Sequence, residues 1–190
     1  MKSQRFPQIT LHMVSSLDGF IAKKDGDVSW MQSTDVYEKG KVLTDQEVVD
    51  YLQAIDCYIM GSRTYAEALK LGWPYGDTPV YVWTSKDLSS KRENVTTFSG
   101  DLDSYLAHKL KPHFDNIWVV GGAQTAKTFL QKGLVDQIIL TIVPILLGDG
   151  LLFFDYIGRE ILLHLADVTS YRDGMVELTY RIQKNRIFFS

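Results

Sequence analysis

Short, continuously apolar runs alternate with segments of helical periodicity along this chain, and that alternation limits its fold more than any other feature. Strands that are apolar throughout are buried on both faces, as in a parallel sheet covered by helices. We therefore expect an α/β fold with a mostly parallel central sheet and helices on both faces. The expected strands cover residues 9–14, 57–60, 80–83, 95–98, 117–120 and 138–143, and the expected helices cover 45–55, 64–71, 102–110 and 124–131.

The C-terminal part follows a different pattern. Residues 162–168 and 175–182 alternate between apolar and polar positions around Arg172-Asp173-Gly174, which is typical of an antiparallel hairpin. No internal repeat, low-complexity stretch or linker interrupts residues 1–190. The sequence thus predicts a single domain that closes with a hairpin.

Two of the apolar runs end at glycine and lead directly into a helix, at Met60-Gly61-Ser62 and at Val120-Gly121-Gly122. Glycine lets a backbone approach a ligand closely, and the N–H groups of a helix start carry partial positive charge. A phosphate is the natural occupant of such a place. Two junctions, with Thr84-Ser85-Lys86 at the end of another strand, predict a crevice for a dinucleotide diphosphate. The alternative is a pair of plain turns without a ligand.

Composition excludes several classes of function. The net charge of −3 argues against a nucleic-acid partner, which requires a basic face. Cys57 is the only cysteine, so an intrachain disulfide and a cysteine zinc cluster are excluded, and the four histidines show no metal-ligand spacing. No apolar stretch is long enough to span a bilayer, and no secretory signal precedes the first strand. We expect a cytoplasmic protein without metal or membrane partner.

The order of the short motifs resembles the dihydrofolate reductase fold, and most closely its branch that contains the C-terminal reductase domain of riboflavin-biosynthesis proteins (the RibD C-terminal domain). The resemblance runs over nearly the whole chain. It rests on residues 16–22, Trp30, residues 60–65, Trp73-Pro74, residues 84–86, residues 120–123, residues 133–136 and residues 144–148.

The resemblance implies that NADPH binds at the carboxyl ends of the strands. The first glycine junction and residues 84–86 would hold the adenosine side and its 2′-phosphate, the second junction would hold the diphosphate, and the first strand would border the nicotinamide. A basic residue commonly follows the first glycine in the family, whereas Ser62 stands here and Arg63 comes one residue later. The implied cofactor-binding residues are Val14, Ile21, Ala22, Gly61, Ser62, Arg63, Thr64, Thr84, Ser85, Lys86, Val120, Gly121, Gly122, Ala123, Gln124 and Thr125.

Two carboxylates are candidate catalytic groups. Asp35 follows Trp30 by five residues, the spacing that folate reductases show between a tryptophan and their substrate-gripping acid, but Asp35 could equally be an exposed turn or cap residue. Asp18 lies in a Ser-x-Asp-Gly run that is similar to one beside the ligands of riboflavin-type reductases, and it could equally shape a turn. Trp30 and Trp73 could line the substrate pocket or pack in the core.

The expected function is therefore an NADPH-dependent reductase of a nitrogen heterocycle. The nearest family activity is reduction of 5-amino-6-(5-phosphoribosylamino)uracil, with a related pterin as another substrate. Dihydrofolate reductase activity is one alternative, and a non-catalytic nucleotide-binding homodimer is the other. The resemblance also suggests a homodimer, in which residues 147–154 form a contact or a buried strand.

Overall fold

The computed structural model describes residues 7–88 and 92–184. Its centre is an eight-stranded sheet with the order β5-β4-β3-β6-β1-β7-β10-β9. The strands β1 and β3 to β7 are parallel, whereas β10 runs antiparallel to both β7 and β9. The strands are β1 (Gln8–Ser16), β3 (Cys57–Gly61), β4 (Val80–Trp83), β5 (Val95–Phe98), β6 (Asn116–Gly121), β7 (Gln137–Val143), β9 (Leu163–Ser170) and β10 (Val176–Ile182).

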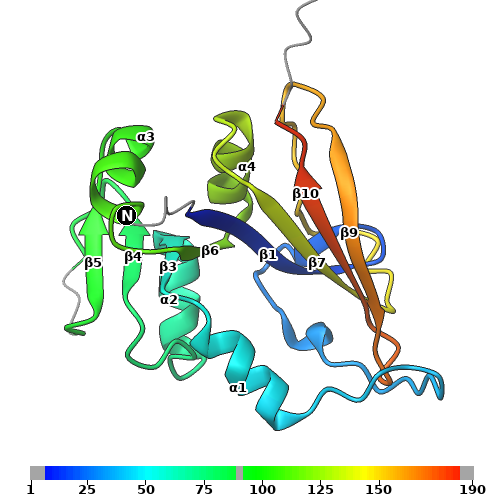
Figure 1. Cartoon of the computed structure of the whole chain (residues 1–190). Coiled ribbons are helices and arrows are strands. Elements are labelled where there is room, and N and C mark those ends of the chain that lie inside the picture. Colours follow the sequence, from blue (N-terminus) through cyan, green and yellow to red (C-terminus); the bar gives the residue numbers. More distant parts are fainter. Residues whose placement is uncertain (1–6, 89–91, 185–190) are drawn as a thin grey trace, which may run out of the picture.

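Helices cover both faces of this sheet, as the sequence predicts (Figure 1). Alternate residues of β3 enter two separate cores: Ile59 packs with α3 and α4, and Met60 packs with α2. The result is a three-layer structure. The helical elements are η1 (Ser29–Met31), α1 (Asp45–Gln53), α2 (Ser62–Lys70), α3 (Leu102–Tyr105), the π-helical turn η2 (Leu106–Leu110) and α4 (Ala123–Gln131).

The start of α1 is confirmed in detail. The Thr44 side chain accepts a hydrogen bond from the Glu47 amide while the Glu47 carboxylate accepts one from the Thr44 amide, which is a complete capping box. The apolar face of the same helix behaves differently from a core face. Val48 and Leu52 are exposed and no residue of α1 is buried, although Tyr51 of this helix packs against His12 and Trp118 of the sheet.

A second, two-stranded sheet does not follow from the sequence pattern. It pairs β2 (Phe20–Ala22) with β8 (Leu151–Leu152). Both leucines of β8 are exposed, whereas the next residue, Phe153, is buried. The segment 147–154 is therefore neither a wholly exposed contact nor a wholly buried strand. The C-terminal hairpin is confirmed, with Gly174 at a φ of 78° in its turn.

Candidate functional site

The two glycine junctions meet at the carboxyl edge of the sheet, because β3 and β6 are direct neighbours. The Thr64 hydroxyl, from the first turn of α2, donates a hydrogen bond of 3.1 Å to the Gly121 carbonyl oxygen. A Cβ atom at Gly61 would lie only 2.8 Å from the Thr125 hydroxyl, and one at Gly122 would lie 3.1 Å from the Thr64 hydroxyl. The glycines thus allow two helix starts to stand side by side, with little room for further side-chain atoms.

Both helices begin without a side-chain cap. Gly61 is the N-cap of α2 and Gly122 is the N-cap of α4, and neither helix has an acidic residue in its first turn. Gly121 and Gly122 adopt φ values of 97° and 39°, which side chains other than glycine rarely adopt. Amide groups at two adjacent helix starts therefore face a place where negative charge is stabilised.

The other residues expected around the adenosine lie on the strand beside this pair. β4 is the neighbour of β3, and Thr84, Ser85 and Lys86 follow its end. The Thr84 hydroxyl accepts a hydrogen bond from the Lys86 amide, which turns the chain there. The side chains of Arg63, Ser85 and Lys86 are exposed. The structure thus brings all three predicted cofactor segments to one edge.

The predicted nicotinamide border lies at the end of β1, on the other side of β6. Val14 is half-buried on the face of the sheet that carries α1, while Ile21 and Ala22 are buried in β2. Gly150 packs directly against the Ala22 carbonyl, leaving no space for a side chain at position 150. The loop after β1 is therefore closely fitted to the segment before β8.

Asp18 joins these two segments. Its carboxylate accepts hydrogen bonds from the Ser16 hydroxyl at 2.6 Å, the Leu147 amide at 3.1 Å and the Gly148 amide at 2.7 Å. The bond from Ser16 is the main cause that lowers the pKa of Asp18 below its ordinary value of 3.8. Asp18 is therefore ionised at neutral pH with its oxygens occupied, which favours the turn-forming alternative over a proton donor.

Asp35 is exposed, and it lies against the turn of the C-terminal hairpin, next to Gly174. Its segment is tied to that turn: the Ser33 hydroxyl donates to the Asp173 carbonyl oxygen, and the Tyr37 amide donates to the Arg172 carbonyl oxygen. The exposure of Asp35 and the attachment of its segment to the hairpin turn favour the exposed-turn alternative.

The two tryptophans differ from each other. Trp30 is buried in η1, and its indole N–H donates to the Asp27 carbonyl oxygen. Trp73 follows α2 at the opposite, amino edge of the sheet, where it packs with Tyr65 and Tyr75 and lies under the Arg92 guanidinium. The structure thus favours the core alternative for Trp73 and does not place it with the predicted cofactor residues.

The sequence patterns do not predict a polar cluster that lies on the sheet face carrying α1. His12 Nδ1 lies 2.7 Å from the Tyr51 hydroxyl, and His12 Nε2 lies 3.4 Å from the Thr141 hydroxyl. Thr141 in turn donates to Glu177, and Tyr171 donates to the other Glu177 oxygen, at 3.2 and 3.3 Å. Burial lowers the pKa of His12 to about 4, so its ring is neutral at pH 7. The sequence signal that could have indicated this cluster is the presence of polar residues, His12 and Thr141, within otherwise apolar strands.

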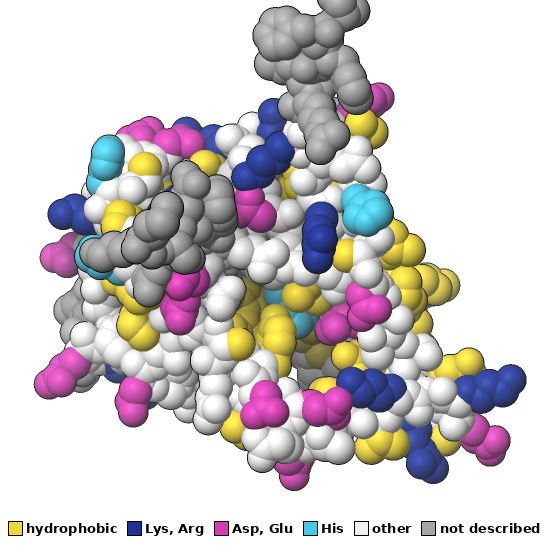
Figure 2. Space-filling view, viewed as in Figure 1, with side chains coloured by type: hydrophobic (Ala, Val, Ile, Leu, Met, Phe, Trp, Pro, Cys, Tyr) yellow, Lys and Arg dark blue, Asp and Glu magenta, His cyan; other side chains and the backbone are white. Residues whose placement is uncertain are grey.

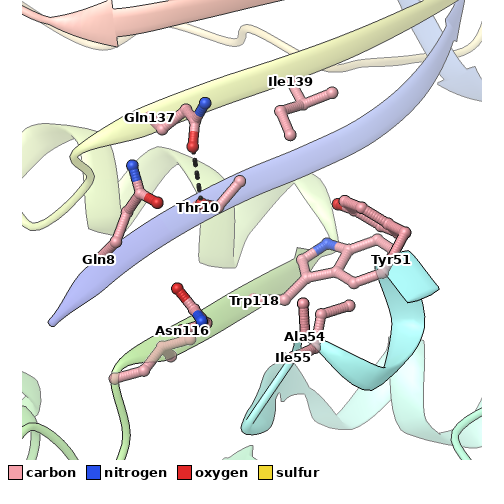
Figure 3. Close-up of a pocket in the computed structure, with 10 residues that line it drawn as sticks. Gln8, Thr10, Tyr51, Ala54, Ile55, Asn116, Trp118, Gln137 and Ile139 are labelled. Carbon is pink, nitrogen blue, oxygen red and sulfur yellow. Dashed lines mark hydrogen bonds between the residues drawn. The ribbon is translucent and has the colours of Figure 1, made fainter.

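A small groove lies beside this cluster, between α1 and the amino halves of β1, β6 and β7 (Figure 3). Its cavity of about 150 Å³ is open to solvent and stands at the edge opposite to the glycine junctions. It is therefore separate from the predicted cofactor site. It is lined by Gln8, Thr10, Tyr51, Ala54, Ile55, Asn116, Ile117, Trp118, Gln137 and Ile139.

A model of the RibD C-terminal domain matches residues 7–176, which include both glycine junctions. The chain belongs to the RibD C-terminal domain family. Its three-layer architecture is the dihydrofolate reductase-like fold that the motifs predicted. The matched range of this RibD C-terminal domain stops one residue before Glu177.

Some similar proteins are covered by this chain over nearly their whole length, and others over little more than half of it. The uncharacterized protein YwjB of Bacillus subtilis is 31% identical over 172 residues, which are 90% of this chain and 95% of that protein. A putative riboflavin biosynthesis protein from Shewanella sp. PV-4 superposes with a TM-score of 0.80 at 25% identity, over 93% of this chain and 99% of that one. A diaminohydroxyphosphoribosylaminopyrimidine deaminase/5-amino-6-(5-phosphoribosylamino)uracil reductase of Thermotoga maritima has a TM-score of 0.69 at 19% identity, over 94% of this chain and 57% of that one.

The described residues show neither a metal-ion cluster nor a membrane-spanning helix. Within residues 7–88 and 92–184, no group of three or more histidine, cysteine, aspartate or glutamate side chains is arranged to hold a metal ion. None of the helices in those two ranges has the length and apolar character that crossing a membrane requires.

Proposed function

We propose that the chain is an NADPH-dependent reductase of a nitrogen heterocycle, of the kind that reduces 5-amino-6-(5-phosphoribosylamino)uracil or a related pterin. The observation that carries the proposal is the pair of uncapped helix starts at Gly61 and Gly122, which a hydrogen bond from Thr64 to the Gly121 carbonyl oxygen links. A diphosphate fits there because the glycines leave backbone amides open to it.

The division of work follows from the positions of the residues. The first turns of α2 and α4 would bind the diphosphate, Lys86 and Arg63 would reach the 2′-phosphate, and Val14 would lie against the nicotinamide. Bound NADPH would supply a hydride from nicotinamide C4. The chain's own task is to orient the substrate against that atom and to exclude water from it.

Turnover is tested by following NADPH oxidation against a panel of pterins, dihydrofolate and ribosylated aminopyrimidines. Oxidation with a ribosylated aminopyrimidine would support the riboflavin-type activity, and oxidation with dihydrofolate would favour dihydrofolate reductase activity. Binding of NADPH without oxidation across the panel would favour the non-catalytic alternative.

Cofactor selectivity gives a first quantitative prediction. Removing Arg63 or Lys86 as alanine variants should weaken NADPH by roughly 1.5–3 kcal/mol and leave NADH nearly unchanged, because a charge-assisted hydrogen bond to the 2′-phosphate is lost. The measurement is the ratio of the two dissociation constants by titration of intrinsic fluorescence. Lys70→Ala, on the exposed far end of α2, is the matched control. Equal weakening of both cofactors would show that neither cation reads the 2′-phosphate.

We also propose that the protein forms a homodimer through the apolar face of its C-terminal hairpin. Leu165 and Val168 of β9 are exposed beside Tyr180 and Leu178 of β10, and in Figure 1 these two strands extend beyond α4. A second copy would cover this exposed apolar patch with its own equivalent patch, since two-fold interfaces bring the same surface of both subunits together.

The dimer prediction is tested by sedimentation. Leu165→Asp with Val168→Asp should shift the protein from dimer to monomer at micromolar concentration, because each carboxylate would be buried without a partner. Leu71→Asp, at an exposed leucine after α2, serves as the control and should leave the mass unchanged. A monomeric wild type would contradict the proposal.

A further inference from the structure

The inference concerns the carboxylate of Glu177 and rests on the proposed function. The strand register places Glu177 on the sheet face that would border the nicotinamide. Val14 of β1 is paired with Thr141 of β7, and Thr141 is paired with Glu177 of β10. Paired residues on neighbouring strands project from the same face, and each strand adds about 4.8 Å. The Glu177 backbone therefore lies roughly 10 Å from that of Val14 across the sheet.

Two hydroxyl groups fix the Glu177 side chain. Thr141 donates to Oε2 at 3.2 Å and Tyr171 donates to Oε1 at 3.3 Å. A carboxylate oxygen has two lone-pair sites, so each oxygen keeps one site for a further donor. The side chain is 24% exposed, so the carboxylate is accessible to a ligand while its orientation is fixed.

The neighbouring His12 does not neutralise this carboxylate. Its Nε2 lies 3.7 Å from Oε2, but the ring is neutral at pH 7 because of its burial. A neutral imidazole has one donor and one acceptor nitrogen. The arrangement that satisfies all three contacts has Tyr51 donating to Nδ1, Nε2–H donating to Thr141, and Thr141 donating to Glu177. The chain of donors therefore ends at Glu177 Oε2.

A cation that pairs with Glu177 is missing from the described part of the chain. Among residues 7–88 and 92–184, no lysine or arginine forms an ion pair with it, and the nearby Lys41 is paired with Glu47 instead. A half-buried negative charge held by hydroxyl groups alone is costly to keep. A ligand that brings N–H groups or a positive charge would offset that cost.

The sheet face that carries Glu177 is hollowed (Figure 2). Figure 2 shows a depression between α1 and the strands β1, β7 and β10, with hydrophobic side chains inside it and acidic ones at its rim. His12 stacks on Trp118 within this region, with ring centroids 4.8 Å apart. A flat heterocycle could therefore rest on this face with its edge toward Glu177.

We propose that Glu177 is the carboxylate that contacts the substrate, by accepting two parallel hydrogen bonds from the N–H and amino groups at the edge of an aminopyrimidine or pterin ring. Thr141 and Tyr171 position it. Asp35, which lies at the hairpin turn, has no part in this contact. The ring edge is held there so that its reducible bond faces the nicotinamide beside Val14.

The test uses the full chain and 2,4-diaminopteridine as the probe. This ring takes up a proton when it pairs with a carboxylate, and its ultraviolet spectrum changes accordingly. The wild type should bind the probe in its protonated form at pH 7. Glu177→Gln should weaken that binding by roughly 10- to 100-fold, the scale for losing hydrogen bonds to a charged group, and should abolish the protonated spectrum. Asp35→Asn, the matched control, should change neither.

The outcomes separate this assignment from the proposed function. NADPH binding is measured independently by thermal shift in all three proteins, and the probe titration is made with and without NADPH. Absence of probe binding to the wild type, an unchanged spectrum in Glu177→Gln, or loss of the spectrum in Asp35→Asn would each overturn the role of Glu177 and leave the cofactor site standing. Absence of an NADPH shift would overturn the cofactor site alone.

Discussion

Replacing Gly122 with valine should abolish the thermal stabilisation by NADPH. At a concentration 100 times its dissociation constant, a ligand of the native state adds about 2.7 kcal/mol, which corresponds to roughly 5–10 °C for a chain of this length. A valine side chain at Gly122 would point at the Thr64 hydroxyl, only 3.1 Å from its first atom, and would fill the space between the two helix starts. The measurement is the melting temperature with and without millimolar NADPH.

Two companion variants separate lost binding from lost folding. Gly72 also has a positive φ, of 87°, but it lies after α2 at the opposite edge, and among the described residues no atom stands within 4 Å of a Cβ built there. Gly72→Val should therefore cost a similar backbone strain and keep the NADPH shift. Gly61→Ala carries no such strain, because φ is −85° at this residue, and should weaken the shift. Full NADPH shifts in folded Gly122→Val and Gly61→Ala would place the diphosphate elsewhere.

Replacing Phe129 with alanine should lower the stability of the protein but leave the stabilisation by NADPH intact. Phe129 is fully buried between α4 and the sheet, so the variant should lose roughly 3–5 kcal/mol of unfolding free energy, or about 6–20 °C in melting temperature. The increment that NADPH adds should remain, because the amides at the start of α4 stand two turns away. Chemical denaturation with and without NADPH measures both quantities.

Leu71→Ala provides the baseline for Phe129→Ala. Leu71 is 67% exposed, and surface substitutions of this kind usually change stability by less than about 0.5 kcal/mol. A Phe129→Ala protein that loses its NADPH increment as well would show that the start of α4 depends on the core packing of its C-terminal half.

Local signals were sufficient to predict the elements that build the cofactor edge. Gly61 and Gly122 were recognisable because each ends an apolar run and opens a helix. Their contact with each other was not predictable from spacing, since it depends on β6 inserting beside β3 and on the hydrogen bond from Thr64 to the Gly121 carbonyl oxygen. Pairing between distant strands is a property of the topology, which short patterns do not encode.

The positions of the candidate substrate-contacting carboxylates, in contrast, could not be predicted from local signals. Asp35 has the right spacing from Trp30, but hydrogen bonds from Ser33 and Tyr37 draw its segment to the hairpin turn. Spacing along a loop fixes no direction, because loop backbone has no period. Glu177 had no motif at all, and only the register of β7 with β10 brings it beside Thr141.

The position of β1 in the sheet has a consequence for synthesis of the protein. Its first residue, Gln8, pairs with Asn116, and Thr10 pairs with Gln137, so both neighbouring strands leave the ribosome more than 100 residues after it. At a usual elongation rate of about 5–20 residues per second, this apolar strand waits on the order of 10 s without a partner. NADPH cannot shorten that interval, because the second glycine junction of its predicted site is formed only when β6 has been made. We therefore expect newly made chains to need chaperones to protect this unpaired apolar strand during translation. NADPH would stabilise only the finished fold.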